Sequence, residues 1–427
     1  MQNLLPTVKD AIALDQSDTL SRFREKFIIP QHDGSNALYF TGNSLGLQPK
    51  KASEFLQVEL EDWATHGVEG HIKARNPWLH YHELFSEGLA SIAGAKPSEV
   101  VAMNGLTVNL HLLLVSFYRP KGKRTKILCE AKAFPSDRYA LLSQIKFHGL
   151  DPAENLIEIA PREGEQTLRL EDILSAIEDA GNELATVMIG GVNYYTGQLH
   201  NLKEITDAAH KVGAMCGFDL AHGIGNVPFK LHDWEVDFAC WCSYKYLNSG
   251  PGAVGGLFIH SKHHNVDLPR FEGWWGHDKS SRFEMGPEYK SMGTAESWQL
   301  SNAPVLNMAV HKASLEVFEE AGGMDILRER SVRLTCFLEK TVHAVSEITG
   351  VNLEILTPSN PDERGCQLSI VAHGYGRELF DAISAKGVVV DWREPAVIRM
   401  APVPLYNSFE DIARFGIILK DALQSKA

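Results

Sequence analysis

The segments GAMCGFDLAHGIG (residues 213–225) and VDFACWCSYKYLNSGPG (residues 236–252) each begin as an apolar run and end in polar, glycine-containing sequence. Each apolar run predicts a buried strand. The first strand ends at Asp219, and Lys245 follows shortly after the second. The two residues are 26 positions apart, about the length of a short crossover and one strand. We therefore expect both side chains at the same edge of a sheet, where open parallel sheets bind their ligands.

Apolar segments alternate with amphipathic segments on both sides of this region. This alternation predicts an α/β fold with a mainly parallel sheet and crossover helices. Strands are predicted at 99–103, 126–130, 185–192, 213–219, 236–242 and 253–259, and helices at 107–117, 136–147, 169–180 and 201–212.

After Gly293 the pattern changes. A long helical stretch at 303–348 precedes short strands at 351–357, 366–371, 387–391 and 396–401 and helices at 375–386 and 408–425. These elements predict a smaller α/β domain at the C-terminal end. The expected division is an N-terminal arm (1–50), a large domain (51–300) and a small domain (301–427).

The 427-residue chain carries 54 acidic and 41 basic side chains and a net charge of −13. This balance argues against nucleic acid or an anionic membrane as the main partner. Six cysteines in mostly apolar surroundings indicate reduced thiols, and Cys240 and Cys242 lack a second pair of metal ligands, so we expect no metal site. The start, MQNLLPTVKD, lacks the features of a signal peptide, and no apolar run is long enough to span a membrane. We expect a cytoplasmic protein.

An aspartate at a strand end, His222 three residues later, and Ser-Tyr-Lys after the next strand form the pattern of pyridoxal phosphate enzymes with the aminotransferase-type fold. In that chemistry the lysine forms a Schiff base with the cofactor aldehyde. The aspartate keeps the pyridine nitrogen protonated, so that the ring can accept electrons. Either residue alone would be explained as a helix cap or a surface lysine. Their combination predicts a cofactor site around Asp219 and Lys245.

Two further segments can complete such a site. Residues 102–111 (AMNGLTVNLH) predict a strand end, a turn at Gly105 and a helix that begins near Leu106 and Thr107. Free N–H groups at a helix N-terminus attract a phosphate, and Thr107 adds a hydroxyl. Residues 133–139 (AFPSDRY) place Phe134 after a strand, where its ring can stack on a cofactor. A plain helix cap and core packing are the alternative interpretations of these segments.

Taken together, these motifs resemble the kynureninase family, pyridoxal phosphate hydrolases of tryptophan and kynurenine catabolism. The resemblance covers nearly the whole chain. It rests on NSLGL (43–47), LTVNLH (106–111), AKAFPSD (131–137), DLAH (219–222), CWCSYKYL (240–247), GWWGH (273–277), LSN (300–302), RGCQL (364–368) and RMAPVPLYN (399–407).

The resemblance implies an aminotransferase-like (fold type I) fold, with a mainly parallel seven-stranded sheet in the large domain and a smaller α/β C-terminal domain. It implies a homodimer with the active site at the subunit interface. The implied activity is hydrolytic Cβ–Cγ cleavage of L-kynurenine or 3-hydroxy-L-kynurenine, which gives anthranilate or 3-hydroxyanthranilate and L-alanine. Such an activity belongs to tryptophan catabolism and can feed NAD biosynthesis.

The resemblance also implies residue roles. Lys245, Asp219 and Tyr244 would act in catalysis: Lys245 as Schiff-base lysine and proton shuttle, Asp219 as partner of the pyridinium, and Tyr244 at the phosphate and as proton relay. Arg399 would hold the substrate carboxylate through two hydrogen bonds. Further cofactor contacts would come from Leu106, Thr107, Phe134, Ser136, Asp137, His222, Trp274 and Asn302, the last two from the neighbouring subunit. Substrate contacts would come from Ser44, His71, Asn302 and Arg399.

Three positions bear on details of the site. Gly190 stands at a strand end where similar proteins carry Ser or Thr, so one cofactor contact would be missing or supplied by water. His71 and Asn302 match the branch of the family that prefers the 3-hydroxylated substrate. Either side chain can hydrogen-bond a ring hydroxyl, which gives discrimination when the pair is buried.

Four other classes of protein share part of this sequence pattern or of the expected fold. A class V aminotransferase needs the same aspartate and lysine. A cysteine desulfurase needs a nucleophilic cysteine on a mobile loop, whereas Cys366 lies in an apolar run. A catalytically silent binding protein would be expected to lack the lysine or the aspartate. A nicotinamide-dependent dehydrogenase is disfavoured because no strand leads into G-x-G-x-x-G.

Overall fold

The computed structural model describes residues 5–425, and its central element is a seven-stranded sheet. The strand order is β6-β12-β11-β10-β9-β7-β8, in which all neighbours from β11 to β8 are parallel and β12 is antiparallel to both of its neighbours. β7, β9, β10 and β11 are almost wholly buried, as expected for parallel strands covered on both faces. The strands are β6 (Val100–Ala102), β7 (Lys126–Glu130), β8 (Leu156–Ile159), β9 (Leu184–Gly190), β10 (Met215–Asp219), β11 (Phe238–Trp241) and β12 (Gly256–Ile259).

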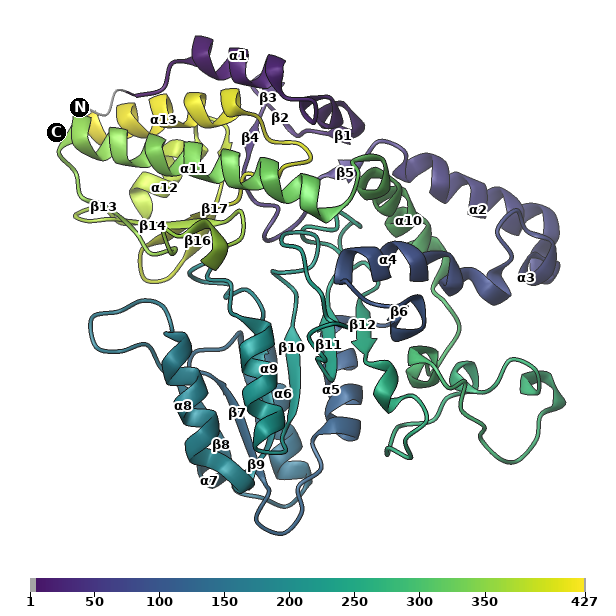
Figure 1. Cartoon of the computed structure of the whole chain (residues 1–427). Coiled ribbons are helices and arrows are strands. Elements are labelled where there is room, and N and C mark those ends of the chain that lie inside the picture. Colours follow the sequence, from purple (N-terminus) through teal and green to yellow (C-terminus); the bar gives the residue numbers. More distant parts are fainter. Residues whose placement is uncertain (1–4, 426–427) are drawn as a thin grey trace.

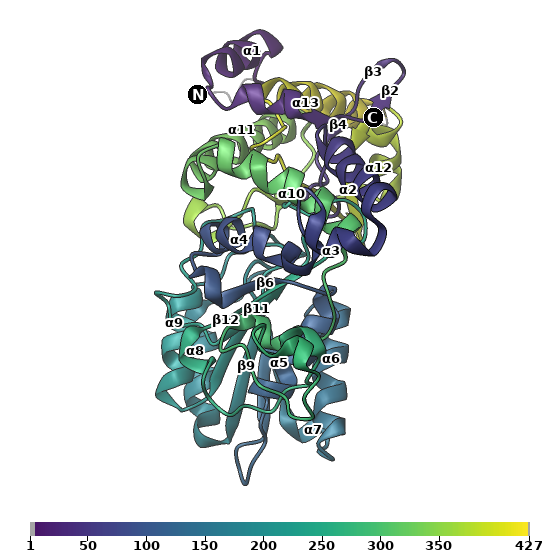
Figure 2. The same cartoon turned by 90° about the vertical axis from the view of Figure 1, so that its right-hand side faces the viewer.

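Helices cover both faces of this sheet (Figures 1 and 2). On one face lie α8 (Leu170–Ala180) and α9 (Leu202–Lys211), and on the other α5 (Leu106–Phe117), α6 (Pro135–Phe147) and α7 (Pro152–Asn155). Local sequence sets where these helices begin. Pro135 occupies the first turn of α6, and the Asn201 side chain accepts a hydrogen bond from the N–H of Glu204 at the start of α9.

A second, antiparallel sheet lies in the upper part of Figure 1, with the strand order β13-β14-β17-β16. The N-terminal residues join this part of the molecule, because β4 pairs with β15 and α1 packs on α13. One apolar cluster accordingly contains Ala11, Leu38 and Phe40 together with C-terminal residues. The elements are α1 (Val8–Ser17), β4 (Leu38–Tyr39), α11 (Met324–Thr349), β13 (Leu353–Ile355), β14 (Leu368–Ala372), α12 (Arg377–Ser384), β15 (Val388–Val389), β16 (Asp391–Arg393), β17 (Val397–Met400) and α13 (Phe409–Gln424).

Four further helices lie to the right of the second sheet in Figure 1, and α2 packs against α10. They are α2 (Ala52–His66), α3 (Gly70–Lys73), α4 (Ser86–Ala93) and α10 (Val305–Glu320). Short pairs of strands complete the N-terminal segment: β1 (Phe27–Ile28) with β5 (Gln48–Pro49), and β2 (Gln31–His32) with β3 (Ser35–Asn36). Within residues 5–425, no helix is both long and apolar enough to cross a membrane.

The predicted fold class is confirmed, and three local predictions are corrected. The strand at 156–159 was missed because it is short and at the sheet edge, with Glu158 paired to Arg138. The helical stretch at 303–348 is two helices, since Gly322 and Gly323 have φ angles of +88° and +89° and end the first one. The segment 387–391 is divided between β15 and β16, which pair with different partners. The division of the chain at residues 50 and 300 stays a prediction.

Candidate active site

A cavity opens at the carboxyl ends of β7, β9, β10 and β11, where an open parallel sheet binds ligands. Nine of the residues proposed from the sequence line it together, although they come from four separate segments. They are Leu106, Thr107, Phe134, Ser136, Asp137, Asp219, His222, Tyr244 and Lys245.

The Lys245 side chain projects into this cavity from the loop that follows β11. Its Nζ atom lies 2.9 Å from Nε2 of His222 and 5.8 Å from the centre of the Phe134 ring. Burial, and next the positive charge of Lys245, lower the pKa of His222 well below its ordinary value. A neutral His222 ring can therefore accept a hydrogen bond from the lysine ammonium.

Two carboxyl groups lie side by side in the cavity. Asp219 ends β10 and accepts a hydrogen bond from the N–H of Ala221 at 2.6 Å. Asp137, in the first turn of α6, also lines the cavity beside Asp219, and its Oδ1 atom is buried without a partner. Burial, and next the charge of Asp219, raise the pKa of Asp137 well above its ordinary value. The pair can thus share a proton and present about one negative charge to a cation.

The N-terminus of α5 forms another wall of the cavity. Gly105 is the N-cap residue of this helix, and no side chain forms a capping hydrogen bond there. The first N–H groups of α5 therefore have no side-chain acceptor at the N-cap. Asn109 holds the preceding turn, because its Nδ2 donates to the Met103 carbonyl and its Oδ1 accepts from Asn104. The cavity is therefore bordered by the positive end of a helix dipole, at Leu106 and Thr107.

These groups fit one kind of ligand. The cavity offers an amine, a carboxyl pair, a helix N-terminus and the Phe134 ring, which is 40% exposed, and His222 keeps its buried Nδ1 unpaired. An aromatic ring with an aldehyde, a protonated ring nitrogen and a phosphate would use each of them. The residues present therefore fit pyridoxal phosphate.

Arg399 reaches this region from the second sheet. It is 1% exposed on β17, donates to the Tyr194 carbonyl at 2.5 Å and forms an ion pair with Asp391. Its Nε atom is buried without a partner. Tyr194 itself lines the cavity, so Arg399 stands one residue behind the cavity wall. Ser44 lies in a separate hollow, which Asp391 also lines.

The N-terminal segment contacts the lysine loop directly. The N–H of Gly46 donates to the Tyr244 carbonyl at 2.8 Å. A Cβ atom at position 46 would lie 2.3 Å from the Lys245 carbonyl oxygen and from Oδ1 of Asn248. Only glycine permits this approach, which explains the glycine in the NSLGL motif.

His71, Trp274 and Asn302 do not line this cavity within the described chain. His71 lies on α3, with Nδ1 3.0 Å from the Val68 carbonyl oxygen, while Trp274 is 46% exposed and Asn302 is exposed. Figure 1 shows α3 and the loop that contains Trp274 on the same, right-hand side of the molecule.

The segment around Trp274 is fixed to the rest of the chain by charged contacts. Lys279 bridges Glu83 at 2.7 Å and Glu296 at 2.8 Å, and His82 lies 2.8 Å from Glu296. Burial opposes ionisation of Glu296, but the hydrogen bonds from His82 and Lys279 prevail and lower its pKa to about 2. This segment is therefore held in place although its apolar side chains are exposed.

Sequence reasoning missed several residues of the cavity. Glu130, Val192, Tyr194, Ala221 and Cys242 also line it. Glu130 is the last residue of a predicted strand, so the rule that ligands lie beyond strand ends was enough to find it. Tyr194 follows β9 in a loop whose course only the tertiary structure sets.

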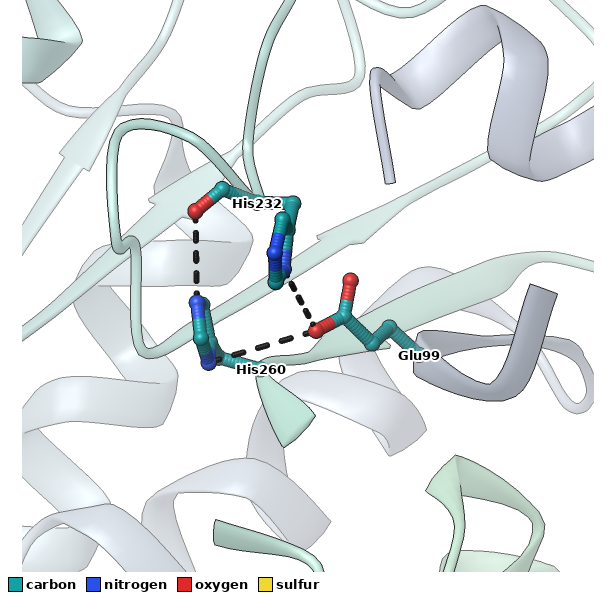
Figure 3. Close-up of side chains that lie close together, drawn as sticks. All are labelled: Glu99, His232 and His260. Carbon is teal, nitrogen blue, oxygen red and sulfur yellow. Dashed lines mark hydrogen bonds and ion pairs between the residues drawn. The ribbon is translucent and has the colours of Figure 1, made fainter. Parts of the chain in front are cut away.

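A second group of candidate ligand residues lies away from this cavity and is shown in Figure 3. Nδ1 of His232 and the N–H of Ser261 each lie 2.8 Å from Oε1 of Glu99. His260 is engaged at both nitrogens, with the Lys262 N–H at 3.0 Å and the His232 carbonyl at 3.2 Å. These atoms already have hydrogen-bond partners, so the group cross-links three loops instead of offering free ligand atoms.

Solved structures with the same fold define the class of protein. A structure of a C-DES mutant, titled as having glycine covalently linked to the pyridoxal phosphate cofactor, has a TM-score of 0.76, with 17% identity, and covers 90% of this chain and 97% of its own. The cysteine desulfurase CsdA from Escherichia coli has a TM-score of 0.75, with 15% identity, and covers 96% and 99%. The fold is thus that of the aminotransferase-like, fold type I class of pyridoxal phosphate enzymes.

Sequence relatives give the family. Kynureninases from Flavobacterium psychrophilum and Myxococcus xanthus are each 55% identical, over 98% and 94% of both chains respectively. Residues 327–419 match the family model of the kynureninase C-terminal domain. The chain belongs to the kynureninase family.

Proposed function

We propose that this chain hydrolyses the Cβ–Cγ bond of L-kynurenine or 3-hydroxy-L-kynurenine and releases L-alanine with anthranilate or 3-hydroxyanthranilate. The observation that carries this proposal is identity of 55% with kynureninases over nearly the full length. The cavity supports it independently, because Lys245 and the Asp137–Asp219 pair converge there.

The enzyme uses pyridoxal phosphate. When bound, this cofactor supplies an electron-poor ring that accepts the electrons left when the substrate Cα loses its proton. We propose that Lys245 bonds to its aldehyde, that Asp219 faces its ring nitrogen and that Phe134 stacks on the ring. The α5 N-terminus, at Leu106 and Thr107, and the Tyr244 hydroxyl would hold the phosphate.

The protein groups divide the proton transfers. The Lys245 amine would remove the Cα proton and return a proton to the reacting system. His222 accepts a hydrogen bond from Lys245 and so holds its amine at that point. Water adds to the side-chain ketone, the Cβ–Cγ bond breaks, and Tyr244 relays a proton to the alanine carbon. Burial raises the pKa of Tyr244, so its hydroxyl is protonated at neutral pH and has a proton to give.

Arg399 is the proposed partner of the substrate carboxylate. Its guanidinium is buried and directed at Tyr194 in the cavity wall, and its unpaired Nε leaves a donor available. The Asp391 ion pair holds the guanidinium plane in place. Ser44 would bind substrate from the hollow on the other side of Asp391.

We propose further that the active enzyme is a homodimer and that Trp274, Asn302 and His71 act in the site of the partner subunit. Exposed large apolar side chains are found on α2, α3 and the 274–285 segment and on the turn at Val68. Figures 1 and 2 show α3 and the 274–285 segment on one side of the molecule. Patches of this kind mark interaction surfaces. Their members include Trp63, Val68, Ile72, Trp274, Phe283 and Met285, which are 46–80% exposed. In such a dimer, His71 and Asn302 would contact the ring hydroxyl of 3-hydroxykynurenine.

Mixing inactive subunits tests this arrangement. Lys245→Ala and Asn302→Ala variants should each lose activity as pure preparations. The two variants are then mixed, dissociated and allowed to reassociate. A mixed dimer contains one site in which Lys245 of one subunit and Asn302 of the other are both intact. Activity should therefore return. Without recovery of activity in the mixture, the shared site would be ruled out.

Product analysis tests the activity itself. The purified protein, loaded with pyridoxal phosphate, should convert kynurenine to anthranilate and alanine in equal amounts, and borohydride should fix the cofactor at Lys245. Formation of a transaminated keto acid would indicate an aminotransferase. Comparing kynurenine with 3-hydroxykynurenine, for the parent enzyme and His71 and Asn302 variants, tests the proposed hydroxyl contact.

The desulfurase alternative is disfavoured by the state of the cysteines. All six are free thiols; five are buried, and burial raises the pKa of Cys366 to about 12. Cys336 lies within α11, with its Sγ atom 3.7 Å from Nη2 of Arg364. None is an exposed thiolate on a mobile loop, which that reaction requires. Free buried thiols also support the proposal that the enzyme works in the cytoplasm.

A further inference from the structure

A third carboxylate lines the cofactor cavity beside Asp137 and Asp219. Glu130 ends β7, is 4% exposed, and its charge contributes to the raised pKa of Asp137. In the sheet order, β9 lies between β7 and β10, so Gly190 at the end of β9 separates Glu130 from Asp219. The three acidic residues thus border one corner of the cavity from α6 and from two strand ends.

Gly190 determines how far Glu130 reaches. A Cβ atom at position 190 would lie 2.9 Å from Oε1 of Glu130, which is closer than real Cβ contacts. The carboxylate therefore occupies the space that a side chain at 190 would need. The Glu130 carboxylate thus lies beside the end of β9, where Glu130 lines the cavity.

The two oxygens of Glu130 have different surroundings. Oε2 accepts a hydrogen bond from Nδ2 of Asn193 at 2.7 Å, and Nε2 of His200 lies 3.8 Å away behind it. Oε1 has no hydrogen-bond partner among residues 5–425, although the residue is buried and lines the cavity. A buried carboxylate with one oxygen fixed and the other open to a cavity is suited to contact a ligand there.

We propose that Glu130 is a cofactor-binding residue of this enzyme: Gly190 leaves room for its carboxylate, and Oε1 contacts the bound pyridoxal phosphate. This inference rests on the assignment of the cavity to that cofactor. Glu130 takes the place of the strand-end side chain that Gly190 lacks, and Asn193 holds it in position.

The test is titration of the apoenzyme with pyridoxal phosphate, followed by the absorption spectrum. Glu130→Gln keeps the shape and the hydrogen bond from Asn193 but removes the charge. Its cofactor dissociation constant should rise about 3- to 10-fold, with a shifted absorption band, because the charge beside the ring has changed. Glu130→Ala should bind the cofactor at least about tenfold more weakly. The matched control is Glu158→Gln, which removes a carboxylate from neighbouring β8 and should leave both readouts unchanged.

A second pair of variants tests the relation with Gly190. Gly190→Ser should raise the dissociation constant several-fold in the parent, because the added side chain displaces Oε1. In the Glu130→Ala background the same change should add no further loss, since residues that act together are not additive. If Glu130→Ala fails to fold, as judged by circular dichroism, Glu130→Ser, which also vacates the space beside Gly190, carries this comparison.

The inference is overturned if folded Glu130 variants bind the cofactor within twofold of the parent with an unchanged spectrum, or if Gly190→Ser costs as much without Glu130 as with it. Failure of the parent protein to bind pyridoxal phosphate at all would instead overturn the proposed function.

Discussion

Nζ of Lys245 and Nε2 of His222 lie 2.9 Å apart, so the partly buried amine has a histidine as its hydrogen-bond partner in place of a carboxylate. The 23-residue separation in sequence is closed by β11, which runs parallel to β10 and returns the chain to the same sheet edge. Because burial, and next the charge of Lys245, lower the pKa of His222 well below its ordinary value, the ring stays neutral at neutral pH and can accept the hydrogen bond.

The first prediction concerns this contact. Replacing His222 with Leu should lower kcat about 10-fold or more, because the free Lys245 amine loses a hydrogen-bond partner worth about 1.5–3 kcal/mol that holds it in place for proton transfer. His222→Gln keeps an acceptor and should lose less. Steady-state kinetics measures both, and equal losses in the two variants would contradict the proposed role.

The second prediction concerns Arg399. Arg399→Lys keeps the charge but loses the planar fork, so the KM for substrate should rise about 10- to 100-fold, with a smaller change in kcat. Arg393→Lys is the matched control, since Arg393 also pairs with Asp391, at 3.2 Å, but is far more exposed. Steady-state kinetics decides: similar KM values for both variants would place the substrate carboxylate elsewhere.

The third prediction is a pH dependence of stability. The pKa of Glu296 is lowered to about 2 from an ordinary value of 4.5, so its ionised form stabilises the fold above about pH 4.5 and loses this effect as the pH falls towards 2. Glu296→Gln should lower the Tm at pH 7, through a loss on the order of 3 kcal/mol. The difference from the parent should narrow between pH 4.5 and pH 2. Thermal unfolding across this range measures it, with the exposed Glu54→Gln as control; a difference independent of pH would show that packing, not charge, is responsible.

The fourth prediction concerns the contact between the N-terminal segment and the lysine loop. Gly46→Ala places a methyl group 2.3 Å from the Lys245 carbonyl oxygen, so the backbone of one segment must move. We expect a lower Tm and a kcat/KM reduced at least tenfold. Gly88→Ala, in α4, is the control, because the added atom would meet only the Leu315 side chain, at ordinary contact distances of 3.5 Å and 3.8 Å, and should lower neither quantity. An unaffected Gly46→Ala enzyme would show that the segment does not support the site.

Much of the fold could be predicted because burial leaves a direct pattern in the sequence. The strands β7, β9, β10 and β11 are mainly apolar. The first three end at a polar residue or glycine near the cavity, and Cys242 follows the end of β11 there. The edge strand β8 carries Glu158 on an exposed side and left no such signal. The break between α10 and α11 depends on two glycines that a periodicity argument passes over.

The sequence by itself determined the class of chemistry, because Asp219, His222 and Lys245 lie at or just beyond the ends of two consecutive strands and so reach one sheet edge. Only the tertiary structure decided which other groups face them. Asp137 approaches Asp219 from a helix, Arg399 arrives from another sheet with Asp391 as its partner, and Glu130 enters the cavity across Gly190. These contacts join segments far apart in the chain, and their geometry depends on packing between layers, which local sequence patterns do not record.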